Sequence, residues 1–134
     1  MSQVFADTSF YQAFFNKRDR WHFEAKRLVE ALESGIVTTD YILVELGALM
    51  ARGEARALYI RFVDQVRADP DTELIAASRD LFNQGLALFA ARLDKGWSLT
   101  DCISFAVMRE RGLVQALTSD HHFEQAGFAC LLLN

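Results

Sequence analysis

Short apolar segments alternate with longer amphipathic segments along this chain. The short segments are rich in β-branched and aromatic residues, and each is followed by a polar cluster, a pattern typical of buried strands. They cover residues 3–7, 36–38, 72–76, 114–117 and 129–133. The longer segments place apolar residues at helical spacing and predict helices near 10–14, 23–32, 40–51, 54–68, 79–93, 98–112 and 121–126. Strands that alternate with helices predict an α/β fold with a mainly parallel sheet and helices on both faces.

The best-defined helix is the one over residues 98–112. Ser98 has the position of an N-cap, Asp101 stands three residues later as in a capping box, and Gly112 suits a left-handed C-terminal stop. Asp101 also lies at the margin of the apolar stripe of this helix. Its carboxylate therefore has two explanations, a structural cap or part of a functional site.

Three further carboxylates have unusual positions. Asp7 and Asp120 lie at the carboxyl ends of predicted strands, and Glu45 stands in a strongly apolar helix with little solvated face. The carboxyl ends of parallel strands form one edge of the sheet, where ligands of open α/β sheets bind. Since Glu45 and Asp101 lie near the starts of helices that begin on the same side, we expect Asp7, Glu45, Asp101 and Asp120 to converge there.

A site built from carboxylates suits Mg²⁺ or Mn²⁺ rather than zinc, which favours thiolate and imidazole ligands. His121 and His122 do not change this interpretation, because adjacent side chains on one turn cannot easily face the same ion. We interpret them as surface or substrate-contacting histidines.

Length and composition limit the remaining possibilities. A chain of 134 residues with 51% hydrophobic residues suits a single domain spanning 1–134. Its N-terminus lacks the pattern of a signal peptide and no apolar run is long enough for a membrane span, so we expect a cytoplasmic protein. The formal net charge of -4 gives no general attraction to nucleic acid, so such a substrate requires local basic patches or bound metal ions.

The chain resembles the PIN-domain ribonucleases, and most closely the VapC-type toxins of bacterial toxin-antitoxin pairs. The resemblance rests on residues 5–9, on Glu45 in its apolar helix, on residues 98–101 and on residues 117–128, in that order. It implies a three-layer α/β/α sandwich and Mg²⁺-dependent endonuclease cleavage of RNA, with Mn²⁺ as a substitute metal.

The resemblance also assigns roles. Asp7, Glu45, Asp101 and Asp120 match the acidic quartet of the family, with Asp7 and Asp101 as the direct metal ligands. Ser9 and Thr118 match hydroxyl positions that support the site. The implied partners are an RNA substrate and a cognate antitoxin. The helices before Gly53 and through Val66 carry more large apolar side chains than one small sheet can cover, so we further expect a homodimer and a groove for the antitoxin.

Three other functions were considered. A metal-dependent phosphatase or a phosphate-accepting signalling domain would also place aspartates at strand ends. A receiver-type domain, however, needs an early acidic pair and a late lysine, and the last lysine here is Lys95. A non-catalytic interaction module of the same fold would be expected to lose acidic residues, and all four are present. A PIN-fold nuclease that acts on DNA or in RNA processing stays open at this stage.

Overall fold

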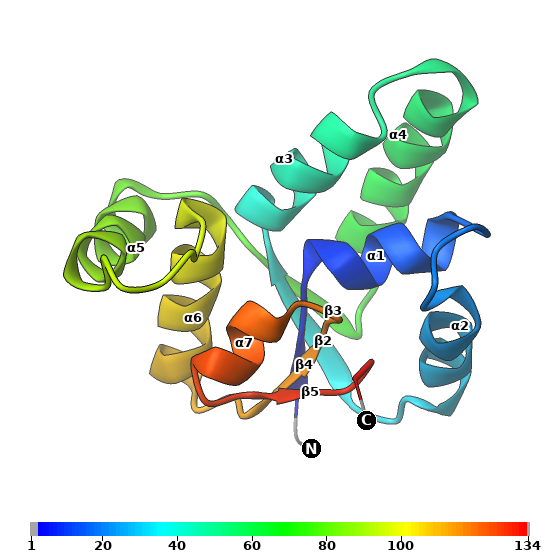
Figure 1. Cartoon of the computed structure of the whole chain (residues 1–134). Coiled ribbons are helices and arrows are strands. Elements are labelled where there is room, and N and C mark those ends of the chain that lie inside the picture. The colour runs from blue at the N-terminus through cyan, green and yellow to red at the C-terminus, as the bar shows by residue number, and fades with distance from the viewer. Residues whose placement is uncertain (1–2, 134) are drawn as a thin grey trace.

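The computed structural model describes residues 3–133, which form a five-stranded, entirely parallel sheet with the strand order β3-β2-β1-β4-β5 (Figure 1). The strands are β1 (Gln3–Ala6), β2 (Gly35–Thr39), β3 (Thr72–Ile75), β4 (Gln115–Leu117) and β5 (Ala129–Cys130). All five predicted strands are present. The last one is shorter than predicted, because the chain turns after Cys130 and the amide of Leu133 donates to the carbonyl of Cys130 (3.1 Å).

Helices occupy the predicted segments between the strands. They are α1 (Thr8–Phe15), α2 (His22–Ala31), α3 (Asp40–Leu49), α4 (Gly53–Ala68), α5 (Arg79–Ala91), α6 (Leu99–Arg111) and α7 (His121–Gln125). None of these helices is both long and apolar enough to cross a membrane. The boundaries differ from prediction by a few residues, as is usual at helix ends.

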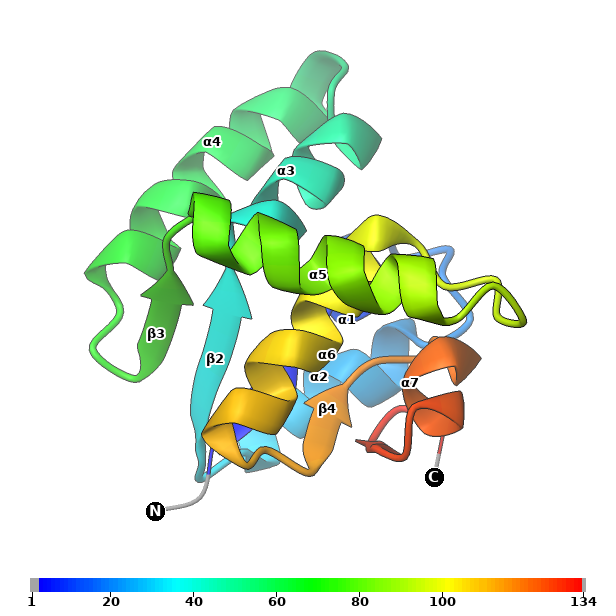
Figure 2. The ribbon, with the colours of Figure 1, turned by 90° about the vertical axis from the view of Figure 1, so that its left-hand side faces the viewer.

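The helices form layers on both faces of the sheet. In Figure 2, α5 and α6 lie in front of the strands, whereas α1 and α2 lie behind them. The predicted three-layer α/β/α architecture with a parallel sheet is therefore confirmed.

Helix α6 packs closely between the sheet and α5. Its capping box is formed: Ser98 Oγ accepts from the Asp101 amide (3.0 Å), and the Asp101 carboxylate accepts from the Ser98 amide (3.1 Å). Gly112 ends the helix with a φ of 67°, a left-handed conformation that glycine adopts without strain. These contacts define the two ends of the helix and hold the Asp101 carboxylate at its first turn.

The strand order reverses beside β1. From β1 the chain passes to β2 and β3 on one side, and later to β4 and β5 on the other. The carboxyl ends of β1 and β4 therefore border the point where strand order reverses, which is where ligands bind in open parallel sheets.

Candidate active site

Asp7 lies directly after β1 and at the point where the strand order reverses. Its amide donates to the carbonyl of Leu117, the last residue of β4, across 3.1 Å. Its side chain is only 4% exposed and forms the N-cap of α1. A buried carboxylate is thus held between two neighbouring strands by the fold itself.

Two hydroxyl groups donate to the same oxygen of this carboxylate. Ser9 Oγ and Thr118 Oγ1 each lie 2.8 Å from Asp7 Oδ2. Burial nevertheless raises the pKa of Asp7 from 3.8 to about 7, because the two hydrogen bonds only partly offset desolvation and the charges of Asp101 and Asp120 add to it. A neighbouring cation would counteract this cost of ionisation.

Thr118 and Ser9 connect the start of α1 to the loop after β4. Thr118 Oγ1 accepts from the Asp120 amide (2.9 Å), and Ser9 Oγ accepts from the Ser119 amide (3.0 Å). The two hydroxyls also lie 3.0 Å apart. Both residues therefore lie where a supporting role at the site was predicted.

This network predicts a stability difference between two threonine substitutions. Thr118→Val removes a donor to Asp7 and leaves the Asp120 amide without its acceptor, so we expect it to lower the free energy of unfolding by about 1–3 kcal/mol. Thr8→Val is the matched control, because Thr8 Oγ1 is buried and has no hydrogen-bond partner among the described residues. Urea unfolding should show little or no loss for the control. Equal losses in the two variants would contradict a supporting role for Thr118.

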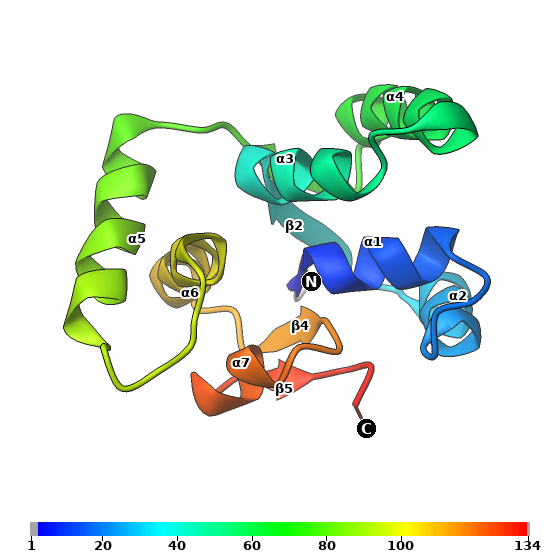
Figure 3. The same ribbon diagram turned by 45° about the horizontal axis from the view of Figure 1, so that its top comes forward.

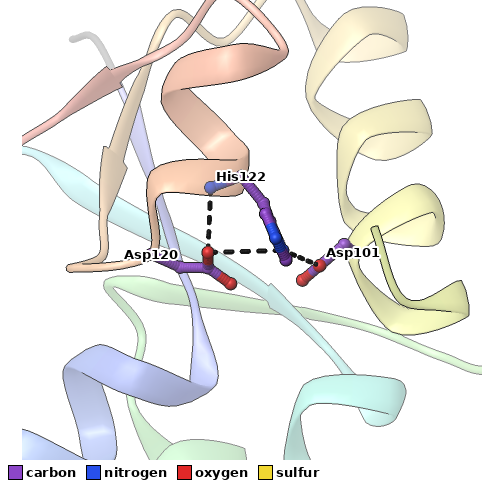
Figure 4. Close-up of side chains that lie close together, drawn as sticks. All are labelled: Asp101, Asp120 and His122. Atoms are coloured by element: carbon purple, nitrogen blue, oxygen red, sulfur yellow. Dashed lines mark hydrogen bonds and ion pairs between the residues drawn. The ribbon is translucent and has the colours of Figure 1, made fainter. Parts of the chain in front are cut away.

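Asp101, Asp120 and His122 bring three potential metal-ligand atoms close together in the described part of the chain (Figure 4). One atom of each lies within 4.8 Å of the other two. His122 Nδ1 is 2.9 Å from Asp101 Oδ2 and 3.4 Å from Asp120 Oδ1. Burial, with a smaller contribution from the charge of Asp120, raises the pKa of Asp101 despite its hydrogen bonds to Ser98 and His122.

Glu45 reaches the same site from α3. It lines a pocket of about 310 Å³ together with Asp7, Asp101 and Asp120, and its side chain is half-buried. The structure thus brings all four predicted carboxylates, from four separate segments, to one pocket. Figure 3 shows the starts of α1, α3, α6 and α7 around this end of the sheet.

The donor set fits a divalent cation. Four carboxylates supply hard oxygen ligands, and two of them have raised pKa values that a cation would oppose. Asp7 and Glu45 lie outside the tight group of three ligand atoms, although they line its pocket.

His122 is the residue that the sequence analysis missed. The interpretation of both histidines as surface or substrate-contacting groups holds for the position of His121, whose side chain is 74% exposed, but His122 contacts the two aspartates. Part of the reason is local: Asp120 caps α7 by accepting from the His122 amide (2.8 Å), and the His122 ring lies between Asp120 and Asp101. The sequence did contain a signal for this position, because His122 stands two residues after Asp120 at the end of a strand.

The comparisons with known proteins agree with this geometry. The model of the PIN domain family matches residues 4–129. The chain belongs to the PIN domain family. A curated relative of this PIN domain, the 23S rRNA-specific endonuclease VapC20 of Mycobacterium tuberculosis, is 32% identical over 130 aligned positions, in an alignment that covers 93% of this chain and 95% of the relative.

The comparison with solved structures finds the same relative. The crystal structure of M. tuberculosis VapC20, described as a sarcin-ricin loop cleaving toxin, superposes with a TM-score of 0.85 and 28% identity over 94% of this chain and 96% of that chain. A toxin-antitoxin complex from Klebsiella pneumoniae gives a TM-score of 0.60 and 18% identity over 88% of this chain and 87% of that one, which supports the fold alone.

Proposed function

We propose that this chain is a single PIN domain that cleaves RNA with Mg²⁺ and acts as the toxin of a toxin-antitoxin pair. The observation that carries the proposal is the convergence of Asp7, Glu45, Asp101 and Asp120 on one pocket at the reversal of strand order. The homology to an rRNA-specific endonuclease over 93% of the chain supports RNA rather than DNA as substrate.

Each carboxylate has a proposed role. Asp7 and Asp101 hold the metal directly, while Glu45 and Asp120 complete its surroundings, in part through water. Ser9 and Thr118 bind one oxygen of Asp7, which leaves the other oxygen for the cation. A bound Mg²⁺ supplies charge neutralisation at the phosphodiester and activation of the attacking water, and Mn²⁺ can replace it.

The function is tested by direct comparison of substrates. Purified protein is incubated with 23S rRNA, an unrelated single-stranded RNA and single-stranded DNA, each with Mg²⁺, with Mn²⁺ and with excess chelator. We expect metal-dependent cleavage of rRNA and no cleavage of DNA. Cleavage in chelator would refute the metal requirement, and preferential cleavage of DNA would favour the DNA-directed alternative.

The antitoxin is proposed to bind an apolar groove that is separate from the pocket of the four site carboxylates. A cavity of about 260 Å³ opens between α1, α2 and α4, and its lining includes Phe10, Phe14, Phe15, Val29 and Phe62. An amphipathic segment of a partner can bury its apolar side chains in such a groove. The toxin-antitoxin complex among the structural neighbours shows that this fold occurs in such assemblies.

A homodimer is proposed on a different surface. Helix α3 exposes Val44 (70%), α5 exposes Phe89 (44%), and the turn after α5 exposes Leu93 (90%). The starts of α3 and α5 adjoin, because the hydroxyl of Tyr41 donates to the carbonyl of Ser78 (3.0 Å). Light scattering at micromolar concentration tests the dimer.

We also propose that the protein acts in the cytoplasm, where its RNA substrate is found and where its two free cysteines remain reduced.

A further inference from the structure

His122 differs from its neighbour His121 in what its ring faces. The His122 side chain is 34% exposed, and its Nδ1 atom lies 2.9 Å from Asp101 Oδ2 and 3.4 Å from Asp120 Oδ1 (Figure 4). The His121 ring is 74% exposed, and its Nδ1 lies 3.7 Å from Glu124 on the outer side of α7. One imidazole nitrogen therefore joins two carboxylates of the pocket.

We propose that His122 Nδ1 is a metal ligand, so that the site binds divalent cations that accept nitrogen, such as Co²⁺ and Zn²⁺, more tightly than Mg²⁺. This inference rests on the proposed metal-dependent function and adds to it a residue and a selectivity. It adds one nitrogen atom beside the oxygen of Asp101, a direct ligand in the proposed function, and beside that of Asp120, which completes the surroundings of the metal.

The different preferences of these metals for oxygen and for imidazole nitrogen explain why Co²⁺ and Zn²⁺ should bind more tightly than Mg²⁺. Mg²⁺ prefers oxygen ligands and gives up its bound waters reluctantly, so an imidazole adds little to its affinity. Later first-row metals bind imidazole well and rank above Mn²⁺ in general affinity. The three ligand atoms lie within 4.8 Å of one another, a spacing that one cation can bridge.

An alternative role for His122 is to orient Asp101 by donating an Nδ1–H hydrogen bond. That role requires the proton on Nδ1, whereas a ligand requires the lone pair there and the proton on Nε2. Substitution by asparagine separates the two roles. The asparagine amide can still donate to Asp101, but it provides no imidazole nitrogen.

The first test compares His122→Asn with the matched control His121→Asn in the metal-stripped full-length protein. Isothermal titration calorimetry with Co²⁺ and with Mg²⁺ gives the affinity of each variant. For His122→Asn we expect the Co²⁺ affinity to fall about tenfold or more, while the Mg²⁺ affinity changes much less. The control should match the parent for both metals. Equal losses for Co²⁺ and Mg²⁺, or no loss for Co²⁺, would overturn the inference.

A spectroscopic test starts from the parent protein, so its expected signal does not depend on how the variant folds. Pulsed electron paramagnetic resonance of bound Mn²⁺ should show coupling to a histidine nitrogen, which changes when the histidines are labelled with ¹⁵N. His22 does not compete for this role, because it is buried and its Nδ1 bonds to the carbonyl of Ala13 (2.8 Å).

The outcomes distinguish this inference from the proposed function. Mn²⁺ that binds without nitrogen coupling would overturn the ligand role of His122 but leave metal-dependent cleavage intact. A parent protein that binds neither Mn²⁺, Co²⁺ nor Mg²⁺ would overturn both proposals. Coupling that persists in His122→Asn would assign the nitrogen to another residue and overturn the inference.

Discussion

Asp7→Asn should abolish cleavage and, at the same time, stabilise the metal-free protein. The loss of a charged oxygen ligand weakens binding of a hard dication, so we expect activity to fall by at least about a hundredfold. In chelator at pH 8, the free energy of unfolding should rise by about 1–3 kcal/mol, because ionised Asp7 is buried and its raised pKa of about 7 marks an unfavourable charge.

The hydrogen bonds of Asp7 support this choice of substitution. Asparagine keeps a carbonyl oxygen that can accept from Ser9 and Thr118, and it is a good N-cap for α1. The variant thus removes the charge while the network remains. A loss of both activity and metal-free stability would mean that the carboxylate serves mainly as a structural cap.

The control for this experiment is Asp80→Asn. Asp80 is an exposed aspartate in the first turn of α5, and its carboxylate bonds to Gln84 rather than to the site. Its loss should leave cleavage unchanged and cost at most a few tenths of a kcal/mol. Thermal melts of the parent and both variants, first in chelator and then in Mg²⁺, complete the test. Mg²⁺ should stabilise the parent and the control but not Asp7→Asn.

The stability of the metal-free protein should fall as the pH rises from 5 to 8. The pKa of Asp7 is about 7 in the folded protein and near 3.8 when unfolded, so between these values the folded state binds more protons than the unfolded state. By linkage, this contribution is fully present below the unfolded pKa and is lost as the pH rises through the folded pKa. The raised pKa of Asp101 acts in the same direction.

The expected size of the effect is about 2–3 kcal/mol between pH 5 and pH 8, on the basis of about 1.4 kcal/mol for each pKa unit. Urea unfolding in chelator across this range measures it. The same titration of Asp7→Asn should lack most of the decline, which isolates Asp7 from other titrating groups. Saturating Mg²⁺ should flatten the profile of the parent, because the cation competes with the proton. A stability that rises from pH 5 to pH 8 in the parent would contradict the raised pKa.

The sequence alone determined the elements of this fold. Strands were predicted because short β-branched and aromatic runs end at polar clusters, and the helix of Asp101 was predicted from Ser98 and Gly112, both of which cap it in the structure. These are local signals, since caps and periodicity depend on residues within a turn or two. The parallel sheet followed from the alternation of strands and helices.

The sequence also placed the candidate carboxylates at one edge of the sheet. Asp7 and Asp120 were assigned there because each follows a strand, and Glu45 because an isolated carboxylate in an apolar helix needs a polar partner. The structure places both aspartates and Glu45 in the lining of one pocket. The resemblance to PIN-domain ribonucleases was needed to select RNA cleavage among the functions that such a site supports.

Only the tertiary structure decided how these groups meet. The two explanations of Asp101 both apply: its Oδ2 accepts from the Ser98 amide as a cap and lies 2.9 Å from His122 in the pocket. The location of His122 depends on the turn that Asp120 caps after β4, and on the position of α6 beside that turn. Distances between segments more than 20 residues apart are set by strand order and helix packing. Local patterns in the sequence do not contain them, because side chains from distant segments acquire their neighbours only when the layers pack.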